Sequence, residues 1–331
     1  MASRDATRLR AGVDYPRDLS QFDRFFPDED ACLRYLEGLR WPEGFVCPKC
    51  QQPGDVWRMK RGLLLCRRCR AQVSVTAGTI FEGTRKPLKL WFIAAWEITG
   101  HKYGANALNV KRMLGVSSYK TAWAWLHKLR RAMVRPGRDR LNGIVEVDES
   151  YVGGEEEGAR GRYTEKKAVV AIAVEVIDEK QLGRVRLRRV PNVTGSSLQG
   201  FVTDAVTPGA TVMTDGFSSY ATLPTLGYDH LVLNQSASPD PAHVLMPAVH
   251  RVSSLLKRWL LGTYQGAVSN EHLNYYLDEF AFRFNRRRSR SRGLLFYRLL
   301  EQAVQVSPVP TSTLFLGVGR GRHRRRPHHY R

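Results

Sequence analysis

Two pairs of cysteines have the type and spacing of a metal site. Cys47 and Cys50 form one C-x-x-C pair and Cys66 and Cys69 form another, with 15 residues between the pairs. Two β knuckles at this spacing present four thiolates to one tetrahedral Zn²⁺, and such a closed site folds a ribbon without leaving an open position for catalysis. A redox C-x-x-C needs a βαβ context that this region lacks. The fifth cysteine, Cys32, lies in an apolar stretch and is expected in the core.

Two aspartates have the setting of a second metal site. Asp148 lies within the apolar stretch GIVEVDESYV, and Asp215 ends the apolar stretch ATVMTD before a glycine. Carboxylates on a buried strand are costly unless cations compensate them, so a metal ion is a natural partner. Carboxylates on adjacent strands can bridge two Mg²⁺ ions, which activate a water or a 3′-hydroxyl for phosphoryl transfer. Taken alone, Asp215 could equally be a turn residue, because aspartate before glycine is typical of turns.

The net charge points to a polyanionic partner. The 331 residues include 52 Lys and Arg against 31 Asp and Glu, which gives a formal net charge of +21. This excess suits nucleic acid, although a generally basic, solvated surface is the alternative. The basic residues are spread along the chain, and the sequence has neither a long apolar run nor a signal peptide. We therefore expect a soluble, intracellular protein of two or three domains that does not bind membranes.

Helical patterns occur on both sides of the cysteine-rich ribbon. Residues 1–40 predict a helical lead-in, and residues 41–84 contain the ribbon. Residues 85–135 predict three helices that form a DNA-binding segment. Gly115 stands at a helix-turn-helix elbow, and Ser117 is expected to cap the helix that follows.

A β-rich pattern follows the helices. Residues 141–305 open with three valine-rich strand candidates, GIVEVDESYV, KKAVVAIAVEVI and GRVRLRRVPNV. Three antiparallel strands, a helix, a strand, a helix and a strand is the order expected of a ribonuclease-H-like domain. We therefore predict an α/β fold of mixed α+β type, in which a ribonuclease-H-like catalytic domain follows the zinc ribbon and the helix-turn-helix segment. Residues 306–331 are expected to be a basic tail.

Several stretches carry a family resemblance. They are the two C-x-x-C pairs, VEVDESYVGG, TDGFSSY, HRVSSLLKRWLLGTYQG and HLNYYLDEFAFRFNRR. From about Phe22 to Leu300 they resemble the insertion-sequence transposases of the ISXO type, a zinc-ribbon branch of the DDE superfamily. The resemblance implies a transposase that cuts the 3′ ends of an insertion sequence and joins them to target DNA with two Mg²⁺ or Mn²⁺ ions. It also implies double-stranded DNA as partner, both terminal inverted repeats and target, and a cytoplasmic, nucleoid-associated place in a prokaryote. Because two DNA ends must be cut together, at least a dimer on DNA is expected.

The same resemblance assigns the catalytic residues. It gives the first two metal ligands as Asp148 and Asp215, and the third as the residue seven positions before Lys257. This chain has His250 there in place of glutamate, with 34 residues between Asp215 and His250. Imidazole can bind divalent metals, so we expect an Asp-Asp-His site. The alternative is that His250 is a helix surface residue in an inactive enzyme. Lys257 lies two helical turns after His250 and is expected to hold a DNA phosphate near the scissile bond.

Basic side chains along the chain are candidates for DNA contact. Arg67, Arg68 and Arg70 lie beside the second cysteine knuckle. Lys120 lies in the helix-turn-helix, and Lys257 and Arg258 lie near the third ligand. Glu271 and Glu279 are reserve candidates for the third metal ligand, although Glu279 lies in a helix whose recurring aromatics indicate core packing. Two other classes stay open: a DNA-binding regulator whose second domain is a scaffold, and a structure-directed nuclease that cuts without rejoining.

Overall fold

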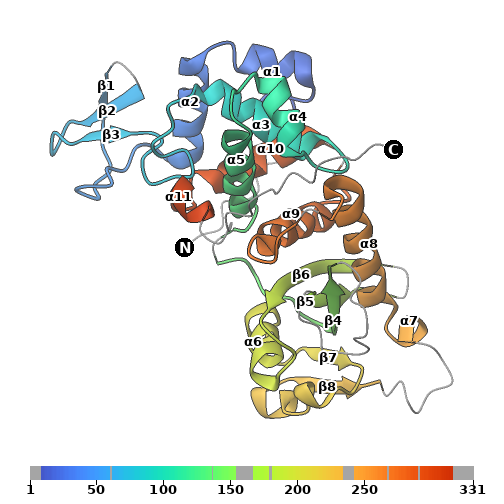
Figure 1. The fold of residues 1–331 in the computed structure, drawn as a ribbon. Helices are drawn as coiled ribbons and strands as arrows, with labels where there is room; N and C mark the ends of the chain where they lie inside the picture. Colours follow the sequence, from blue (N-terminus) through green and yellow to red (C-terminus); the bar gives the residue numbers. More distant parts are fainter. Residues whose placement is uncertain are drawn as a thin grey trace, which may run out of the picture.

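The computed structural model describes residues 9–59, 62–135, 137–153, 167–178, 181–233, 242–266, 268–289 and 291–315. Residues 1–8 of the predicted lead-in and residues 316–331 of the predicted basic tail lie outside the described residues. In Figure 1 a helical part lies above a larger sheet, and a small three-stranded sheet projects to one side. None of the helices in the described part of the chain combines the length and apolar character needed to span a bilayer.

The helical part combines helices from both ends of the chain. It contains α1 (Leu19–Phe25), α2 (Glu29–Arg40), α3 (Leu88–Gly100), α4 (Ala107–Leu114), α5 (Tyr119–Ala132) and α10 (Arg292–Ala303). Asp18 and Asp28 begin α1 and α2 by accepting backbone N–H bonds in the first turn. Phe296 of α10 packs against both Phe22 of α1 and Phe92 of α3. Although α10 lies within residues 141–305, it thus completes the helical core (Figure 1).

The ribbon is an antiparallel sheet of β1 (Val56–Arg58), β2 (Leu63–Cys66) and β3 (Gln72–Ser74), in that order. It is joined to α2 by Arg40, whose guanidinium donates to the carbonyl oxygens of Ser74 and Val75 at 3.1 and 2.7 Å. Leu64 and Val73 are buried and belong to the same core as the helices. The ribbon therefore packs as an extension of the helical part.

The helix-turn-helix consists of α4 and α5. Asn106 caps α4, and Gly115 ends it with a φ of 62°, a left-handed conformation that suits glycine. The elbow at Gly115 is confirmed, but the predicted cap is wrong by one residue: Ser118, not Ser117, stands at the N-cap of α5, and its side chain makes no capping hydrogen bond. The turn after Gly115 is therefore one residue longer than predicted, and it includes the buried Val116.

The larger sheet has five strands in the order β6-β5-β4-β7-β8. They are β4 (Ile144–Val152), β5 (Ala168–Val176), β6 (Leu182–Val190), β7 (Thr211–Thr214) and β8 (Asp229–Val232). β4, β5 and β6 are antiparallel neighbours, whereas β7 pairs parallel to β4 and β8 parallel to β7. This mixed sheet confirms the predicted α/β class and its ribonuclease-H-like fold.

Helices cover both faces of this sheet. Val145 and Val147 pack on one face with α6 (Gly195–Ala205), and α8 (Pro247–Tyr264) and α9 (Leu273–Asn285) cover the other. A short helix, α7 (Ala242–Leu245), precedes α8, and α11 (Thr311–Leu314) follows α10. Between β7 and β8 the chain makes two 3₁₀ turns, η2 (Ser218–Tyr220) and η3 (Leu223–Leu226), where the expected order has a helix.

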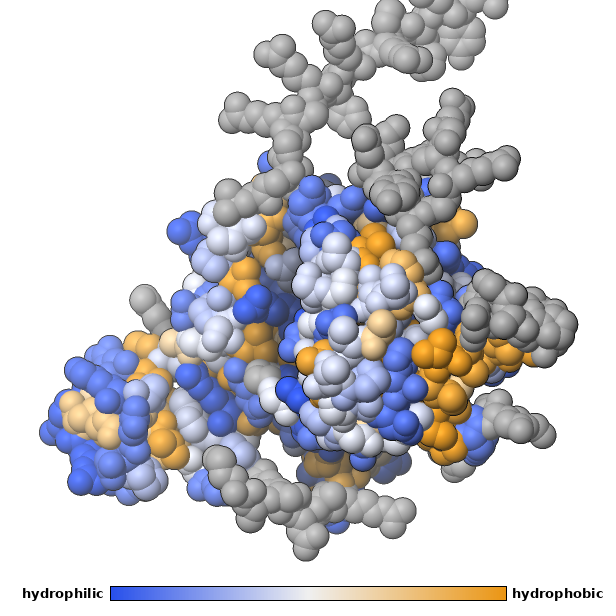
Figure 2. All heavy atoms as spheres, turned by 90° about the horizontal axis from the view of Figure 1, so that it is seen from below, coloured by the Kyte–Doolittle hydropathy of each residue, from blue (hydrophilic) through white to orange (hydrophobic). Residues whose placement is uncertain are grey.

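The edge strand β8 leaves apolar side chains open to solvent. Leu231 and Val232 are about half exposed, at 46% and 48%. The face in Figure 2 is otherwise mostly hydrophilic, with hydrophobic side chains gathered toward one side. The parallel ladder therefore ends at an uncovered strand in the described part of the chain.

A buried ion network joins the helical part to α9. The Glu279 carboxylate accepts from Arg130 of α5 at 2.8 Å and from Arg283 at 2.9 Å, and the exposed fractions of the Glu279 and Arg130 side chains are 0% and 2%. The Tyr264 hydroxyl of α8 lies 3.1 Å from Arg130. Gly104 lies against Glu279 with a φ of +84°, and a Cβ there would collide with the carboxylate. Three elements are thus tied together by one buried charge cluster.

Candidate active site and zinc centre

The four ribbon cysteines converge on one point. The Sγ atoms of Cys47 and Cys69 are 3.7 Å apart, those of Cys50 and Cys66 are 3.9 Å apart, and all four lie within 4.8 Å of one another. A Zn–S bond of about 2.3 Å in a tetrahedron puts neighbouring sulfurs roughly 3.8 Å apart. The donor set and its spacing therefore fit Zn²⁺, and this is the structural zinc site of the ribbon.

The knuckles stabilise thiolates through backbone N–H groups. The N–H of Cys50 lowers the pKa of Cys47 to about 7, and the N–H of Cys69 lowers the pKa of Cys66. Cys69 differs: the N–H of Ala71 lowers its pKa, but burial and the neighbouring sulfurs outweigh this and raise it to about 11. Cys32 is fully buried away from this group, and burial raises its pKa to about 12. The first knuckle cysteine is thus the one most readily held as thiolate.

Replacement of Cys66 by serine is expected to remove the bound zinc, about one equivalent per chain, and to open the ribbon to proteolysis between residues 41 and 84. The reason is that a closed four-sulfur site supplies folding energy to a sheet too small to hold itself. Zinc content and limited proteolysis measure both effects. Cys32→Ala is the control and should keep the metal; retention of a full zinc equivalent by Cys66→Ser would contradict the assignment.

Asp148 and Asp215 lie on neighbouring parallel strands. Glu146 of β4 pairs with Met213 of β7. Continued two residues beyond this last pair, the same register leads to Asp148 on β4 and to Asp215 just after β7 ends. Because side chains alternate along a strand, Asp148 shares its face with Glu146 and Asp215 shares its face with Met213. Val145, Val147 and Val212 pack toward α6, so the alternating positions of Asp148 and Asp215 belong to the other face, which α8 covers; both aspartates are half-buried.

Two hydrogen bonds fix α8 over this part of β4. The Val249 N–H at the start of α8 donates to the Glu146 carboxylate at 2.8 Å, and the hydroxyls of Ser150 and Ser253 are 2.8 Å apart. Glu146 thereby satisfies an otherwise unpaired N–H at a helix N-terminus, a favoured place for a carboxylate. His250 follows Val249 and lies one turn before Ser253. These bonds bracket Asp148 on the strand and His250 on the helix.

A third hydrogen bond connects the TDGFSSY segment to β4. The buried Tyr220 hydroxyl donates to the Glu149 carboxylate at 3.2 Å. The pKa of Tyr220 lies well above its usual value because of burial first, and then because of the negative charges of Glu149, Asp148 and Asp215. Both predicted metal-binding aspartates are therefore close enough to act on the same hydroxyl. The Phe217 N–H also donates to Asp215 at 3.0 Å.

Glu146, Ser150 and Tyr220 lie around these aspartates and were not among the site residues predicted from the sequence. Glu146 had a signal, since its position two residues before Asp148 puts it on the same strand face. Among the described residues, the four cysteines are the one group of three or more His, Cys, Asp or Glu side chains as close as 4.8 Å. Asp148, Asp215 and His250 do not form such a close group among these residues.

The reserve carboxylates lie elsewhere. Glu279 is held by Arg130 and Arg283 in the buried ion network, so its interpretation as a packing residue is confirmed. Glu271 is exposed just before α9. Neither is in the group around Asp148.

The predicted DNA-binding residues are all exposed. Arg67 and Arg70 stack over Trp57, with the guanidinium carbons 5.4 and 4.6 Å from the ring centre, and Arg68 lies beside them. Lys120 is at the start of α5, the second helix of the helix-turn-helix. Lys257 and Arg258 lie on the exposed side of α8. The basic side chains thus occur on three separate elements.

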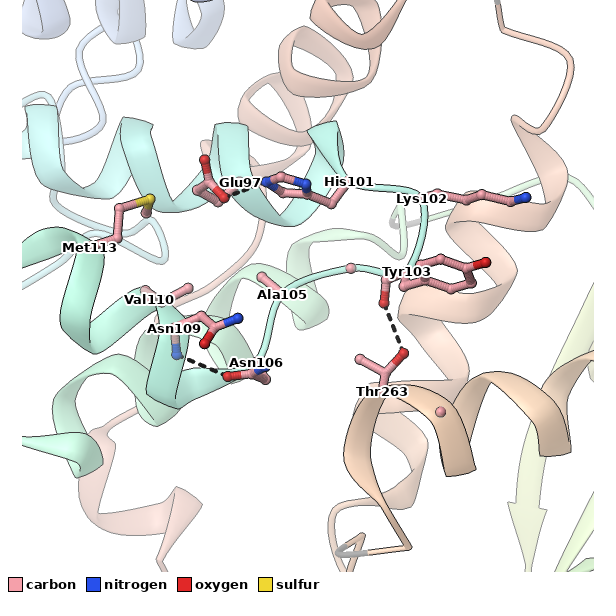
Figure 3. A pocket seen from close by; sticks show the side chains of 12 residues that line it. Glu97, His101, Lys102, Tyr103, Ala105, Asn106, Asn109, Val110, Met113 and Thr263 are labelled. Carbon is pink, nitrogen blue, oxygen red and sulfur yellow. Dashed lines mark hydrogen bonds and ion pairs between the residues drawn. The ribbon is translucent and has the colours of Figure 1, made fainter.

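A cavity of about 570 Å³ lies between the α3–α4 loop and the end of α8 (Figure 3). Its wall is held by the Tyr103 carbonyl, which accepts from Thr263 at 3.1 Å and from Trp259 at 3.0 Å. Asn106 and Asn109 are joined by the α4 cap on the opposite side. None of the predicted catalytic or zinc-binding residues lines this cavity.

Two parts of the chain match known families. Residues 140–285 match the ISXO2-like transposase domain, and residues 27–72 match the transposase zinc-ribbon domain. The chain is 27% identical over 281 residues to an uncharacterized protein in transposable element ISH50 of Halobacterium salinarum, which covers 78% of this chain and 91% of that protein. It is 29% identical over 112 residues to an uncharacterized transposase-like protein of Haemophilus influenzae, with 34% of this chain and 89% of that protein covered.

Solved structures show more distant likeness. The simian T-cell lymphotropic virus intasome in complex with PP2A regulatory subunit B56 gamma is 15% identical with a TM-score of 0.29, over 52% of this chain and 63% of that chain. The Mos1 transposase paired-end complex with left transposon end is 14% identical with a TM-score of 0.22, over 62% and 79%.

Proposed function

Since the chain belongs to the ISXO2-like insertion-sequence transposases, we propose that it cuts the 3′ ends of an insertion sequence and joins them to target DNA at a site formed by Asp148, Asp215 and His250. The observation that supports the proposal is the parallel pairing of β4 with β7 up to Glu146 and Met213, from which we infer that Asp148 and Asp215, each two residues further along, lie near each other. The family accounts for the general activity, DNA transposition. The cleavage and joining steps are our proposal.

The donor set fits hard divalent cations. The carboxylates of Asp148 and Asp215 are ligands that Mg²⁺ and Mn²⁺ prefer, and the imidazole of His250 would suit Mn²⁺ better than Mg²⁺. Two such ions would supply Lewis-acid stabilisation and activate a water for cleavage, or a 3′-hydroxyl for joining. Asp148 and Asp215 would hold them from adjacent strands, and His250 from α8. Lys257, two turns along α8, would hold a phosphate beside the scissile bond.

Recognition of DNA is proposed for the remaining basic elements. Arg67, Arg68 and Arg70 on the ribbon would contact phosphates and set the register, as would Arg258. Lys120 begins α5, which would read the inverted repeat in the manner of a helix-turn-helix. Both terminal repeats and the target are double-stranded DNA, and pairing of two ends would need at least a dimer.

We propose a matching division of the chain. Residues 1–40 are the lead-in, residues 41–84 the zinc ribbon and residues 85–135 the helix-turn-helix. Residues 141–305 are the catalytic domain and residues 306–331 the basic tail. Within this division α10 would belong to the catalytic domain by sequence but pack in the helical core, and it would thereby connect the two.

The direct test is strand transfer by the purified protein on a duplex bearing the inverted repeats that flank its gene. With Mg²⁺ or Mn²⁺, we expect nicked 3′ ends and joined products. Binding of the repeat without metal-dependent cutting would favour a DNA-binding regulator or an inactive relic. Cutting that ignores the repeat and never rejoins would favour a structure-directed nuclease.

Replacement of Glu146 by leucine is expected to slow cleavage by about 10- to 100-fold, the size of effect found for groups that orient metal ligands. Leucine cannot accept the Val249 N–H, so the start of α8, and His250 with it, loses its anchor on β4. Glu146→Gln keeps an acceptor and should restore most of the rate. Repeat binding measured in parallel should be equal in all three proteins; equal cleavage by the leucine variant would show that Glu146 does not position α8.

A further inference from the structure

A second cavity, of about 360 Å³, lies where the helical part meets the larger sheet. Its walls come from the connection after α5, from β6, from α9 and from α10. Six arginines line it: Arg135, Arg138, Arg184, Arg186, Arg286 and Arg298. A volume of this size corresponds to about a dozen waters, at roughly 30 Å³ for each water in the liquid. It has room for a tetrahedral anion with its remaining hydration.

Three of the six arginines have carboxylate partners. The pairs are Arg135–Asp139 at 3.1 Å, Arg184–Glu175 at 2.6 Å and Arg298–Glu301 at 2.7 Å. The charges of these three guanidiniums are therefore balanced within the protein. They also fix the rim of the cavity, since each pair joins neighbouring segments or turns.

The other three guanidiniums are not balanced in this way. Within the described part of the chain, Arg138, Arg186 and Arg286 have no carboxylate at salt-bridge distance. Arg186 is only 6% exposed and donates to the backbone carbonyls of Val185 and Asp139. Arg286 donates to the Phe282 carbonyl. These carbonyl oxygens accept hydrogen bonds from the two guanidiniums, but they carry no negative charge to pair with them.

One further acid, Asp278, lines the cavity, and it offsets only part of this excess. Asp278 forms no ion pair among the described residues, and burial raises its pKa to about 7 in spite of the nearby Arg138. Burial and neighbouring arginines also lower the pKa values of Arg186 and Arg286 to about 10. Clustered, partly desolvated cations of this kind are stabilised by a bound anion.

We propose that this cavity binds a phosphate group, supplied either by the backbone of DNA that crosses the junction or by free phosphate. Guanidinium groups match phosphate because their N–H donors form a planar fork. The DNA source rests on the proposed function, since it requires DNA to run from the helix-turn-helix toward Asp148. A phosphate here would brace α5, α9 and α10 against β6.

The test compares Arg138→Gln/Arg286→Gln with the wild type in two assays. A single Arg138→Gln variant is the second probe, because Arg138 makes no hydrogen bond in the described structure and its loss should not affect folding. Arg24→Gln, which removes an exposed charge from α1, is the control. The first assay measures binding of repeat DNA against salt, without Mg²⁺, Mn²⁺ or chelator. The second measures the rise in Tm with inorganic phosphate over chloride at equal ionic strength.

If a DNA phosphate occupies the cavity, the double variant lowers the slope of log affinity against log salt by about 0.9. Its loss of affinity is then about 3.5-fold larger at 50 mM than at 200 mM salt by the same relation. If free phosphate is the ligand, this slope is unchanged but the phosphate-dependent rise in Tm falls below that of wild type and Arg24→Gln. No change in either assay would overturn the proposal. Because no catalytic metal is added, failure of cleavage elsewhere would leave this result intact.

Discussion

Replacement of Asp148 by asparagine is expected to reduce 3′-end cleavage and strand transfer by at least about 10³-fold. The physical reason is that asparagine keeps the shape of the side chain but loses the negative charge that would hold a divalent cation opposite Asp215. Lewis-acid stabilisation is worth several kcal/mol, and each 1.36 kcal/mol is about tenfold in rate. Cleavage of a repeat-bearing duplex in Mg²⁺ measures the change.

The matched control is Asp204→Asn on α6, an exposed aspartate paired with Arg188 at 2.6 Å. It should cleave at the wild-type rate. Repeat binding by Asp148→Asn should also be unchanged, because the ribbon and helix-turn-helix are untouched. An Asp148→Asn variant that still cleaves within tenfold of the wild-type rate would show that Asp148 is not a metal ligand.

Comparison of His250→Glu with His250→Ala tests the third ligand: the glutamate variant should support cleavage and the alanine variant should not.

Replacement of Glu279 by glutamine is expected to destabilise the protein by about 3–5 kcal/mol. The change leaves Arg130 and Arg283 in a buried place without the charge that compensates both. Removal of one partner of a buried ion pair lowers the free energy of unfolding by far more than the intact pair contributes, because the remaining cation stays desolvated. Urea unfolding measures the free energy.

Glu301→Gln provides the comparison for this experiment. Glu301 pairs with Arg298 at 2.7 Å on the partly exposed side of α10, where such a pair contributes at most about 1 kcal/mol. Adding Arg130→Met to Glu279→Gln should recover part of the loss, which a double-mutant cycle detects. Equal, small losses for Glu279→Gln and Glu301→Gln would mean that water reaches the cluster.

The features that sequence predicted well depend on short stretches of chain. The cysteine pairs, the Gly115 elbow and the strand around Asp148 each follow from neighbouring residues. The expected ribonuclease-H-like order also predicted that the strands carrying Asp148 and leading to Asp215 are neighbours, as β4 and β7 are.

The features that sequence did not reveal depend on distant pairing. Glu146 and Val249 are 103 residues apart, and Glu279 and Arg130 are 149 residues apart. The sequence around a buried glutamate does not show whether its partner is a metal ion, a helix N-terminus or an arginine. Ser117 and Ser118 were likewise indistinguishable, because serine is a common N-cap residue and neither position carries a further local signal.

The packing of α10 against α1 and α3 has a consequence for synthesis on the ribosome. The helical core needs Phe22 and Phe92 from the start of the chain and Phe296 from near its end. The larger sheet, in contrast, has all its strands once residue 232 has emerged. Chains fold from the N-terminus as they emerge, and contacts between distant segments form late. The N-terminal helices therefore cannot complete their core until α10 has been synthesised. A chain released before residue 292 exposes the apolar side chains that α10 would cover. Chaperones and proteases recognise such an exposed apolar surface.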